Sequence, residues 1–120
     1  MADICFKQVN PYRVPTDDNK IIDEHFGKAS YEAGDFSLAR MIAPPGWQEP
    51  FQTPEFDEIT LVLEGKKQID ISDKSIILEP NQSLLVSAGT RVRYSNPFEK
   101  ECIYISLCIP AFTPDRVNRE

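Results

Sequence analysis

The fold is decided by residues 58–96, which have the sequence EITLVLEGKKQIDISDKSIILEPNQSLLVSAGTRVRYSN. Short apolar or alternating stretches follow one another here, and turn residues separate them: Gly65, the polar run Ser72–Lys74 and the pair Pro80–Asn81. Runs of roughly four to eight residues rich in Ile, Val and Leu between such turns predict strands. The run Ser72–Lys74 lies between two of these stretches, so we expect a hairpin there. Asn81 tolerates the positive φ that a tight turn needs.

Alternating strands continue on both sides of this region. On the N-terminal side, FSLARMI at residues 36–42 alternates between two faces and stops before Pro44-Pro45-Gly46. On the C-terminal side, ECIYISLCIP at residues 101–110 has one face of Cys102, Tyr104, Ser106 and Cys108, and an opposite face of Ile103, Ile105, Leu107 and Ile109. Because the second face is wholly apolar, we expect it to pack into the core.

The whole pattern predicts an all-β sandwich or barrel, because several short strands with turns every eight to twelve residues or so occur without a long helical period. The first 34 residues are polar and contain Pro11 and Pro15, so they predict an extended arm with one strand. At the C-terminus, Thr113 is a suitable N-cap and Pro114 suits the first helical position. The tail therefore predicts a short helix.

Composition narrows the classes of function. A chain of 120 residues is the usual size of one domain, and 13 basic against 19 acidic residues give a net charge of −6. The basic residues are scattered, so we expect no nucleic-acid partner. Neither a signal peptide nor a run of about 18 apolar residues is present, so we expect no membrane contact and a cytoplasmic location. Cys5, Cys102 and Cys108 lack CxxC spacing and are expected to be free thiols.

Two segments resemble the paired motifs of the cupin superfamily. The first motif runs Gly, five residues, His-x-His, three or four residues, Glu, six residues, Gly, and GWQEPFQTPEFDEITLVLEG at residues 46–65 keeps its spacing. The second runs Gly, five residues, Pro-x-Gly, two residues, His, three residues, Asn, and NQSLLVSAGTRVRYSN at residues 81–96 keeps that spacing. The resemblance implies a double-stranded β-helix, the cupin jelly-roll barrel. One domain would cover residues 1–120, with an arm at 1–34, the barrel at 35–110 and a tail at 111–120.

The metal-binding histidines of the family are missing. In metal-dependent cupins, two His and a Glu of the first motif and a His of the second hold a divalent ion, and the matching positions here are Gln52, Pro54, Glu58 and Val92. One carboxylate is a poor site for a transition metal, so we expect no metal and no other cofactor. A rescue by Glu49 and Glu55 together with Glu58, or by His25 from the arm, stays open. Against it, Glu55 and Glu58 are three positions apart, which places them on opposite faces of an extended strand.

The interior expected from the motifs is polar. If Glu58 faces inward, Thr60 and Val62 do so too, and an inward Val92 brings Tyr94 with it. The predicted ligand-binding residues are Gln52, Glu58, Tyr94, Arg93, Arg40 and Trp47. Desolvation would raise the pKa of Glu58 so that it could act as a general acid or base, with Tyr94 as the catalytic partner. The same pair could equally form a buried structural network.

Three functions remain open, and the sequence does not say whether the protein is an enzyme. The first is a metal-independent barrel that binds a small polar molecule, and the second is a metal-free lyase or isomerase that uses Glu58 and Tyr94. The third is an accessory or structural cupin of a catabolic pathway, because EFDEITLVLEG at residues 55–65 is similar to ethanolamine-utilisation cupins. The resemblance also implies a homodimer, which would cover exposed barrel edges.

Overall fold

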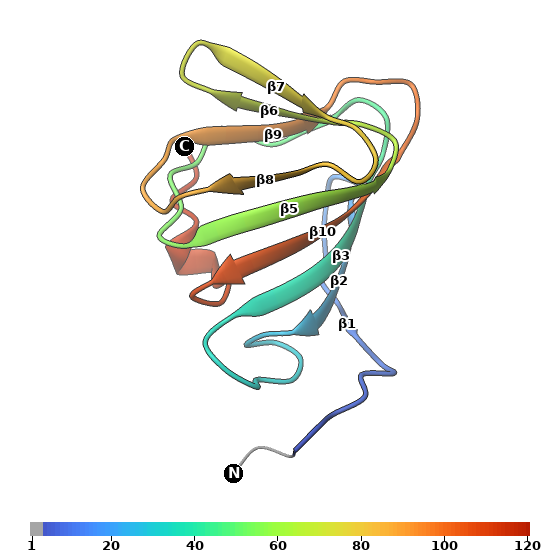
Figure 1. Cartoon of the computed structure of the whole chain (residues 1–120), viewed down its shortest axis with the longest axis vertical. Coiled ribbons are helices and arrows are strands. Elements are labelled where there is room, and N and C mark those ends of the chain that lie inside the picture. The colour runs from blue at the N-terminus through green and yellow to red at the C-terminus, as the bar shows by residue number, and fades with distance from the viewer. Residues whose placement is uncertain (1–3) are drawn as a thin grey trace.

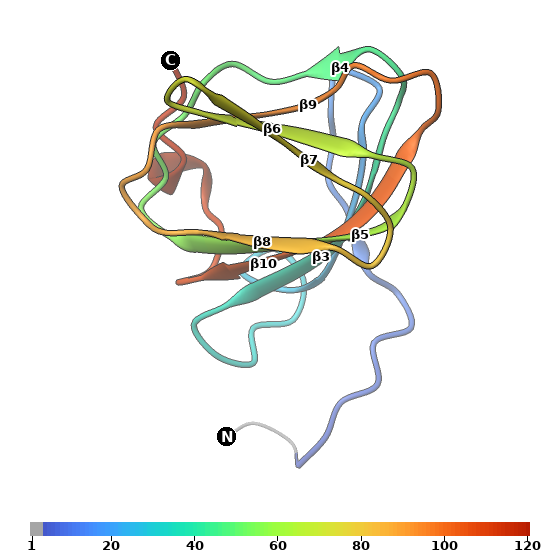
Figure 2. The ribbon, with the colours of Figure 1, turned by 45° about the horizontal axis from the view of Figure 1, so that its top comes forward.

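The computed structural model describes residues 4–120, whose strands form two antiparallel sheets facing each other across the interior (Figure 1). The strands are β1 (Tyr12–Arg13), β2 (Ile21–Phe26), β3 (Ser37–Ala43), β4 (Trp47–Gln48), β5 (Asp57–Glu64), β6 (Lys67–Ile71), β7 (Lys74–Leu78), β8 (Ser83–Val86), β9 (Val92–Asn96) and β10 (Cys102–Ile109). The larger sheet has the order β1-β2-β3-β10-β5-β8 and the smaller one β4-β9-β6-β7. Figure 2 shows the two layers from above, and the predicted all-β barrel is confirmed.

Turn residues end the strands where the sequence predicts. Gly65 has φ +75°, and a Cβ atom there would overlap the backbone oxygen of Glu101, so this position requires glycine. Asn81 has φ +67° after β7, and Ser72 has φ +55° in the hairpin between β6 and β7. Local turn chemistry therefore determines where this part of the barrel reverses direction.

Asn96, the last residue of the second motif, is a structural residue. Its side chain is fully buried, and Nδ2 donates to the carbonyl oxygens of Ala43 (3.1 Å), Pro44 (3.2 Å) and Lys100 (2.9 Å). Its Oδ1 accepts from the backbone N–H of Phe98 (3.2 Å). These bonds join the loop after β3 to the loop after β9, which closes one end of the barrel.

The predicted C-terminal helix is wrong in kind, because only a 3₁₀ turn, η1 (Pro114–Arg116), forms there. The tail instead pairs with the segment at residues 51–55: Glu55 N–H donates to the oxygen of Arg116, and Glu120 N–H donates to that of Phe51. Backbone groups committed to this pairing cannot form the hydrogen bonds of a helix. The N-terminal arm contributes two strands, β1 and β2, to the larger sheet, whereas the sequence predicted one.

The face of β10 that points inward is the opposite of the one predicted. Cys102, Tyr104, Ser106 and Cys108 are buried, while Ile103, Ile105 and Leu107 are half-buried and Ile109 is 48% exposed. The alternation was predicted correctly, but the choice of the apolar face as the core was wrong. β10 lies between β3 and β5, and on its inner face Cys102 and Tyr104 join the buried apolar cluster while Tyr104, Ser106 and Cys108 line a cavity. In the described part of the chain, no helix is long and apolar enough to cross a membrane.

Candidate functional site

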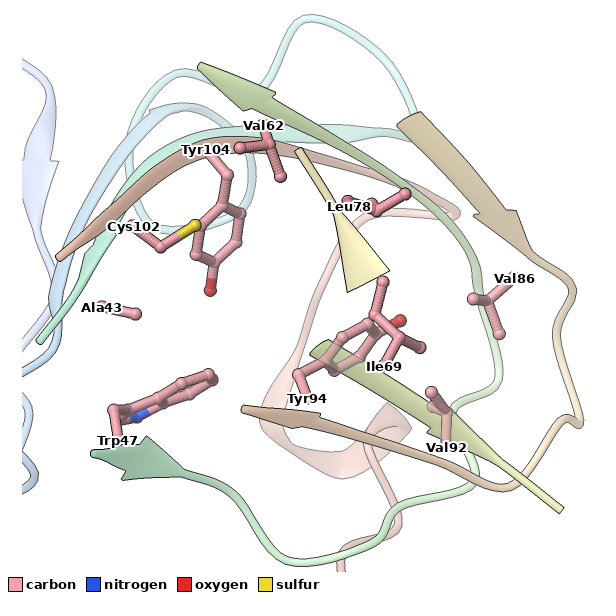
Figure 3. Packing of buried hydrophobic residues seen from close by; sticks show 10 residues of the cluster. All are labelled: Ala43, Trp47, Val62, Ile69, Leu78, Val86, Val92, Tyr94, Cys102 and Tyr104. Carbon is pink, nitrogen blue, oxygen red and sulfur yellow. The ribbon is translucent and has the colours of Figure 1, made fainter. Parts of the chain in front are cut away.

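A cavity of about 390 Å³ lies inside the barrel. Its walls come from the inner faces of β2, β3, β5, β6, β9 and β10, from residues 14–20 of the arm, from the segment at residues 49–56, and from the C-terminal tail. In Figure 3 the side chains of Tyr104, Trp47 and Tyr94 point toward a common interior space. The polar and charged residues of the wall are Thr16, Asp17, Asp18, Lys20, Glu24, Ser37, Glu49, Gln52, Glu58, Lys67, Tyr94, Tyr104, Ser106 and Arg119. A space of this size suits a small ligand.

Glu58 projects into this cavity from β5, where it is 9% exposed. The Ser106 hydroxyl on the neighbouring strand β10 donates to Glu58 Oε2 over 2.6 Å. The two strands pair so that Ser106 lies opposite Thr60, next to Glu58 on the same face. This hydrogen bond through Oε2 holds the carboxyl group in one orientation and does not involve Oε1.

Lys67, the first residue of β6, crosses from the smaller sheet into the same interior and is only 1% exposed. Its Nζ donates to Thr60 Oγ1 over 3.0 Å. The same atom lies 3.6 Å from the ring centroid of Tyr104 and 4.3 Å from that of Tyr94. Among residues 4–120 no carboxylate forms an ion pair with it. Desolvation lowers the pKa of Lys67 to about 7, and the more distant charge of Glu58 opposes this shift.

A second buried lysine, Lys20, enters from the arm. Its Nζ lies 4.2 Å from the ring centroid of Trp47 and 4.0 Å from Glu49 Oε2. Arg119 from the C-terminal tail also reaches Glu49 Oε2, over 3.2 Å. Burial lowers the pKa of Lys20, and the charge of Glu49 is the largest effect opposing that shift. Glu49 therefore links the arm, through Lys20, and the C-terminal tail, through Arg119, at the cavity.

Tyr94 supplies an unused polar group to the cavity wall. Its hydroxyl is buried and makes no hydrogen bond within the described residues. Burial raises the pKa of this phenol well above its ordinary range, and the charge and closeness of the Glu58 carboxyl group add to the shift, so the hydroxyl stays protonated beside Glu58. Buried polar groups without partners are rare in proteins, and this one is available as a donor to a bound molecule.

Cys108 lies close to Glu58 in the wall but is unsuited to act as a nucleophile. Burial, with a contribution from the charge of Glu58, raises the pKa of its thiol to about 12. The reactive form of cysteine is the thiolate, which is therefore scarce at neutral pH.

The structure brings together three of the predicted site residues. Gln52, Glu58 and Tyr94 all line the cavity, although Gln52 Oε1 already accepts from Arg119 Nε over 3.3 Å. Trp47 is buried beside it, where its ring packs against Lys20 and its Nε1 donates to Asp18 Oδ2 over 2.8 Å. Trp47 therefore packs against Lys20, a residue of the cavity wall, and does not line the cavity itself.

Arg40 and Arg93 do not line the cavity, contrary to the arrangement predicted from the sequence. Arg40 is exposed on the outer face of β3, because its neighbours Ala39 and Met41 take the inward positions. Arg93 lies on the outer face of β9, where it pairs with Asp70 over 3.0 Å and its guanidinium carbon lies 4.8 Å from the ring centroid of Phe51. Alternation places each of them opposite an inward-facing neighbour.

Sequence reasoning missed the two buried lysines. Lys67 had a usable signal, because KKQIDI places it on the same face as Ile69, which is fully buried. Lysine is almost never fully buried unless it is paired, so this alternation was not used to place Lys67 inside the barrel. Lys20 had no local signal, since it follows the positive φ of Asn19 and reaches the barrel only through the path of the arm.

The family's metal does not fit the residues at its usual positions. Gln52, Pro54, Glu58 and Val92 offer one amide and one carboxylate, which is too few donors for a transition metal. Lys67 and Lys20 would repel a cation in this interior whenever they are protonated. Across residues 4–120, no group of three His, Cys, Asp or Glu side chains is placed to hold a metal ion.

The other metal donors considered from the sequence lie apart from the cavity or are already engaged. Glu55 is exposed and accepts from Asn118 Nδ2 over 3.0 Å. His25 is not part of the cavity wall. Glu49 lines the cavity, but its carboxylate is paired with Arg119 and Lys20. These positions do not supply the missing ligands.

Sequence comparison places these features among known proteins. A family model described as the cupin domain matches residues 39–109. The chain is 42% identical over 107 residues to a Myxococcus xanthus (strain DK1622) protein named endoribonuclease YbeY. That match covers 89% of this chain but 36% of the relative, so the chain spans little more than a third of the relative's length.

Solved structures share the architecture at low identity. The polyketide cyclase RemF from Streptomyces resistomycificus superposes with a TM-score of 0.75 at 14% identity, covering 98% of this chain and 85% of that one. A protein assigned to ethanolamine utilization (EutQ) from Salmonella typhimurium LT2 gives a TM-score of 0.62 at 17% identity, covering 78% of this chain and 71% of that one. At these identities the likeness shows the fold alone.

Proposed function

The chain belongs to the cupin domain family, and from the contents of its barrel we propose that it binds a small polar molecule in the cavity without using a metal ion. One observation carries this proposal. The cavity of about 390 Å³ contains a buried Tyr94 hydroxyl that has no hydrogen-bond partner among the described residues. A ligand with an acceptor atom would satisfy this hydroxyl, which otherwise makes a net unfavourable contribution to folding.

The other groups in the wall define the class of ligand. Lys67 and Tyr94 offer donors, while the second oxygen of Glu58 offers an acceptor, and all three project from different strands. Met41, Phe56 and Phe112 add apolar surface to the same wall. A molecule with both a donor and an acceptor, and a small hydrocarbon part, matches this mixture. Such convergence of a few polar groups in an apolar cavity is typical of specific small-molecule sites.

A metal-free lyase or isomerase is the second candidate, and the position of Glu58 favours it. Glu58 is held by Ser106 in a cavity that also contains Tyr94, which stays protonated because its pKa is raised. A carboxylate and a phenol of this kind could move a proton from one carbon of a bound molecule and stabilise the charge that develops. The third possibility, an accessory role in a catabolic pathway, would gain weight only if no ligand binds. The cytoplasmic location also remains a proposal.

A thermal-shift and calorimetric screen tests the proposal. The panel contains small sugars, hydroxy acids, amino acids and short keto compounds, and the variants are Tyr94→Phe and Glu58→Gln. A ligand at about 100 times its Kd should stabilise the wild-type protein by about 2.7 kcal/mol. We expect each variant to weaken binding about tenfold or more, because a buried hydrogen bond is lost.

The matched control is Arg40→Gln, on the outer face of β3, which should bind as the wild type does. The proposal fails if no panel member stabilises the wild-type protein. It also fails if Tyr94→Phe and Glu58→Gln bind every hit as tightly as Arg40→Gln.

Elemental analysis of the purified protein tests the metal-free part. We expect Mn, Fe, Ni and Zn at far below one atom per chain, because the usual positions supply too few donors. Stoichiometric metal that disappears in Glu58→Ala would contradict this.

A further inference from the structure

We propose that Lys67 is a nucleophilic amine that forms an imine with a small aldehyde or ketone held in the cavity. This inference rests on the proposed function, because the carbonyl compound must first enter the same cavity. It adds a reaction and a substrate class that a cavity with Glu58 and Tyr94 alone does not indicate.

The position of Lys67 suits an attacking group. Lys67 lines the cavity, and the hydrogen bond from its Nζ to Thr60 Oγ1 holds the end of the side chain in place. The rings of Tyr104 and Tyr94, 3.6 and 4.3 Å from Nζ, restrict its remaining freedom. A flexible lysine loses rotamer entropy when it is ordered, and here folding has already removed that freedom.

Its protonation state also suits the reaction. Only the neutral amine has a lone pair to donate, and desolvation lowers the pKa of Lys67 to about 7. About half of the molecules then carry the neutral amine at pH 7, compared with about one in three thousand for an ordinary lysine of pKa 10.5. The charged and titratable groups that face Lys67 from the elements around it are Glu58, Glu49, Lys20, Cys102, Tyr94 and Tyr104.

Lys20 serves as a contrast within the same cavity. It is also buried, and burial lowers its pKa, but its Nζ lies 4.0 Å from the carboxylate of Glu49, and this ion pair opposes the shift. Lys67 has no such ion pair within the described residues. The proposal therefore concerns Lys67 and not Lys20.

The step balances without an oxidant or a reductant. The Nζ lone pair forms a bond to the carbonyl carbon while the C=O π pair moves to oxygen, and the nitrogen loses one proton as the oxygen gains one. The resulting carbinolamine then loses its hydroxyl group together with the remaining N–H proton as water, and the C=N double bond forms. The Glu58 carboxylate can accept the proton from nitrogen and return it to the departing hydroxyl. The Tyr94 hydroxyl can donate a hydrogen bond to the carbonyl oxygen as charge develops there.

Reductive trapping tests the proposal on the full chain. The protein is incubated at pH 7 with propanal, glycolaldehyde or pyruvate and sodium cyanoborohydride, which reduces an imine to a stable amine. Peptide mass spectrometry then gives the labelling rate at each of the lysines. We expect Lys67 to be labelled by at least one probe about tenfold faster or more than Lys66, its exposed neighbour.

The pH profile and two variants sharpen the test. The labelling rate of Lys67 should rise with a midpoint near pH 7 as the amine loses its proton. Lys67→Met should lose the fast labelling, and Lys66→Met should keep it. Since the site-resolved rates come from the wild-type protein, the result does not depend on whether Lys67→Met folds.

Failure of this inference is distinguishable from failure of the proposed function. If Lys67 reacts no faster than Lys66 with all three probes, the imine proposal is overturned. A positive ligand screen would then leave the binding function standing. If the screen is also negative, both proposals fall.

Discussion

The two faces of β10 differ in burial and in what they contact. Its inner face carries Cys102, Tyr104, Ser106 and Cys108, each at most 5% exposed, and the last three of these line the cavity. Its outer face carries Ile103, Ile105, Leu107 and Ile109, which are half-buried or exposed. Ser106 is accommodated on the inner face because its hydroxyl has a buried hydrogen-bond partner in Glu58. The isoleucines and Leu107 point to the other side of the sheet, where they stay partly exposed.

The outer face continues across the larger sheet. Ile59 and Leu63 on β5 are each 37% exposed, and Leu85 on β8 is 59% exposed. These residues lie on the same side as Ile105, because Leu107 pairs with Ile59, which pairs with Leu85. Contiguous apolar surface of this kind marks an interaction site more often than free solvent-facing sheet. The homodimer expected from the sequence stays a prediction, and this face is where we place it.

The largest difference in stability is expected between substitutions at two adjacent residues of β10, one on each face. Tyr104→Ala should lower the free energy of unfolding by about 3 to 5 kcal/mol, as for other buried aromatic residues. Ile105→Ala should cost about 1 kcal/mol, because its side chain is only partly buried in the single chain. Urea denaturation monitored by circular dichroism measures both. If both substitutions lowered the free energy of unfolding equally, the two faces would not differ, and the outer face would be fully covered in solution.

The interior should also show a pH dependence of stability. The pKa of Lys67 is about 7 in the folded chain and near 10.5 when unfolded, so between these values the unfolded state binds more protons. Stability should therefore rise from pH 7 toward pH 9 by about 2 kcal/mol. At higher pH the trend reverses, because the raised pKa values of Tyr94, Tyr104 and Cys108 make the folded state retain protons that the unfolded state has lost.

Lys67→Met isolates the contribution of this lysine. The variant should be more stable than the wild type by about 2 kcal/mol at pH 7, because an unpaired buried amine is replaced by an apolar side chain of similar length. That advantage should shrink toward pH 9, and the remaining slope reports Lys20, whose pKa is also lowered. Denaturant titrations at pH 7, 8 and 9 provide the measurement. A variant with the wild-type slope would show that Lys67 is not the titrating group.

A smaller effect concerns the hydrogen bond across the inner face. Ser106→Ala removes the donor to Glu58 Oε2 and should cost about 1 to 2 kcal/mol, because a buried carboxylate loses a partner. A double-mutant cycle with Glu58→Gln measures the coupling between the two side chains. Additive effects in that cycle would show that the hydroxyl does not orient the carboxylate.

The smallest effect on folding is expected on the outer face. Leu85→Lys should change the free energy of unfolding by less than about 0.5 kcal/mol in the monomer, since this side chain is exposed. It should nevertheless convert a dimer to a monomer in light-scattering measurements. Ile77→Lys, at 48% exposure on the smaller sheet, is the control and should leave the dimer intact. A wild-type chain that is monomeric at high micromolar concentration would remove the dimer proposal.

The fold and part of the site could be predicted from the sequence, because they depend on residues that are neighbours along the chain. Turn residues such as Gly65 and Asn81 end strands wherever they occur, because their backbone freedom is intrinsic. Alternation has a period of two, so an inward Glu58 places Thr60 and Val62 inward without knowledge of the rest. The substitution of Gln52 and Val92 at metal-ligand positions is likewise visible in the sequence alone. These are statements about neighbours along the chain.

Only the tertiary structure decided which face of β10 turns inward and what the cavity contains. Lys67 meets Tyr94 because β6 and β9 are neighbours in the smaller sheet, and it meets Tyr104 because that sheet faces the larger one. Lys20 and Arg119 meet at Glu49 because the two ends of the chain pack at the same rim. These contacts join residues far apart in sequence, so no local propensity encodes them. Their energies depend on desolvation, which exists only after the barrel has closed.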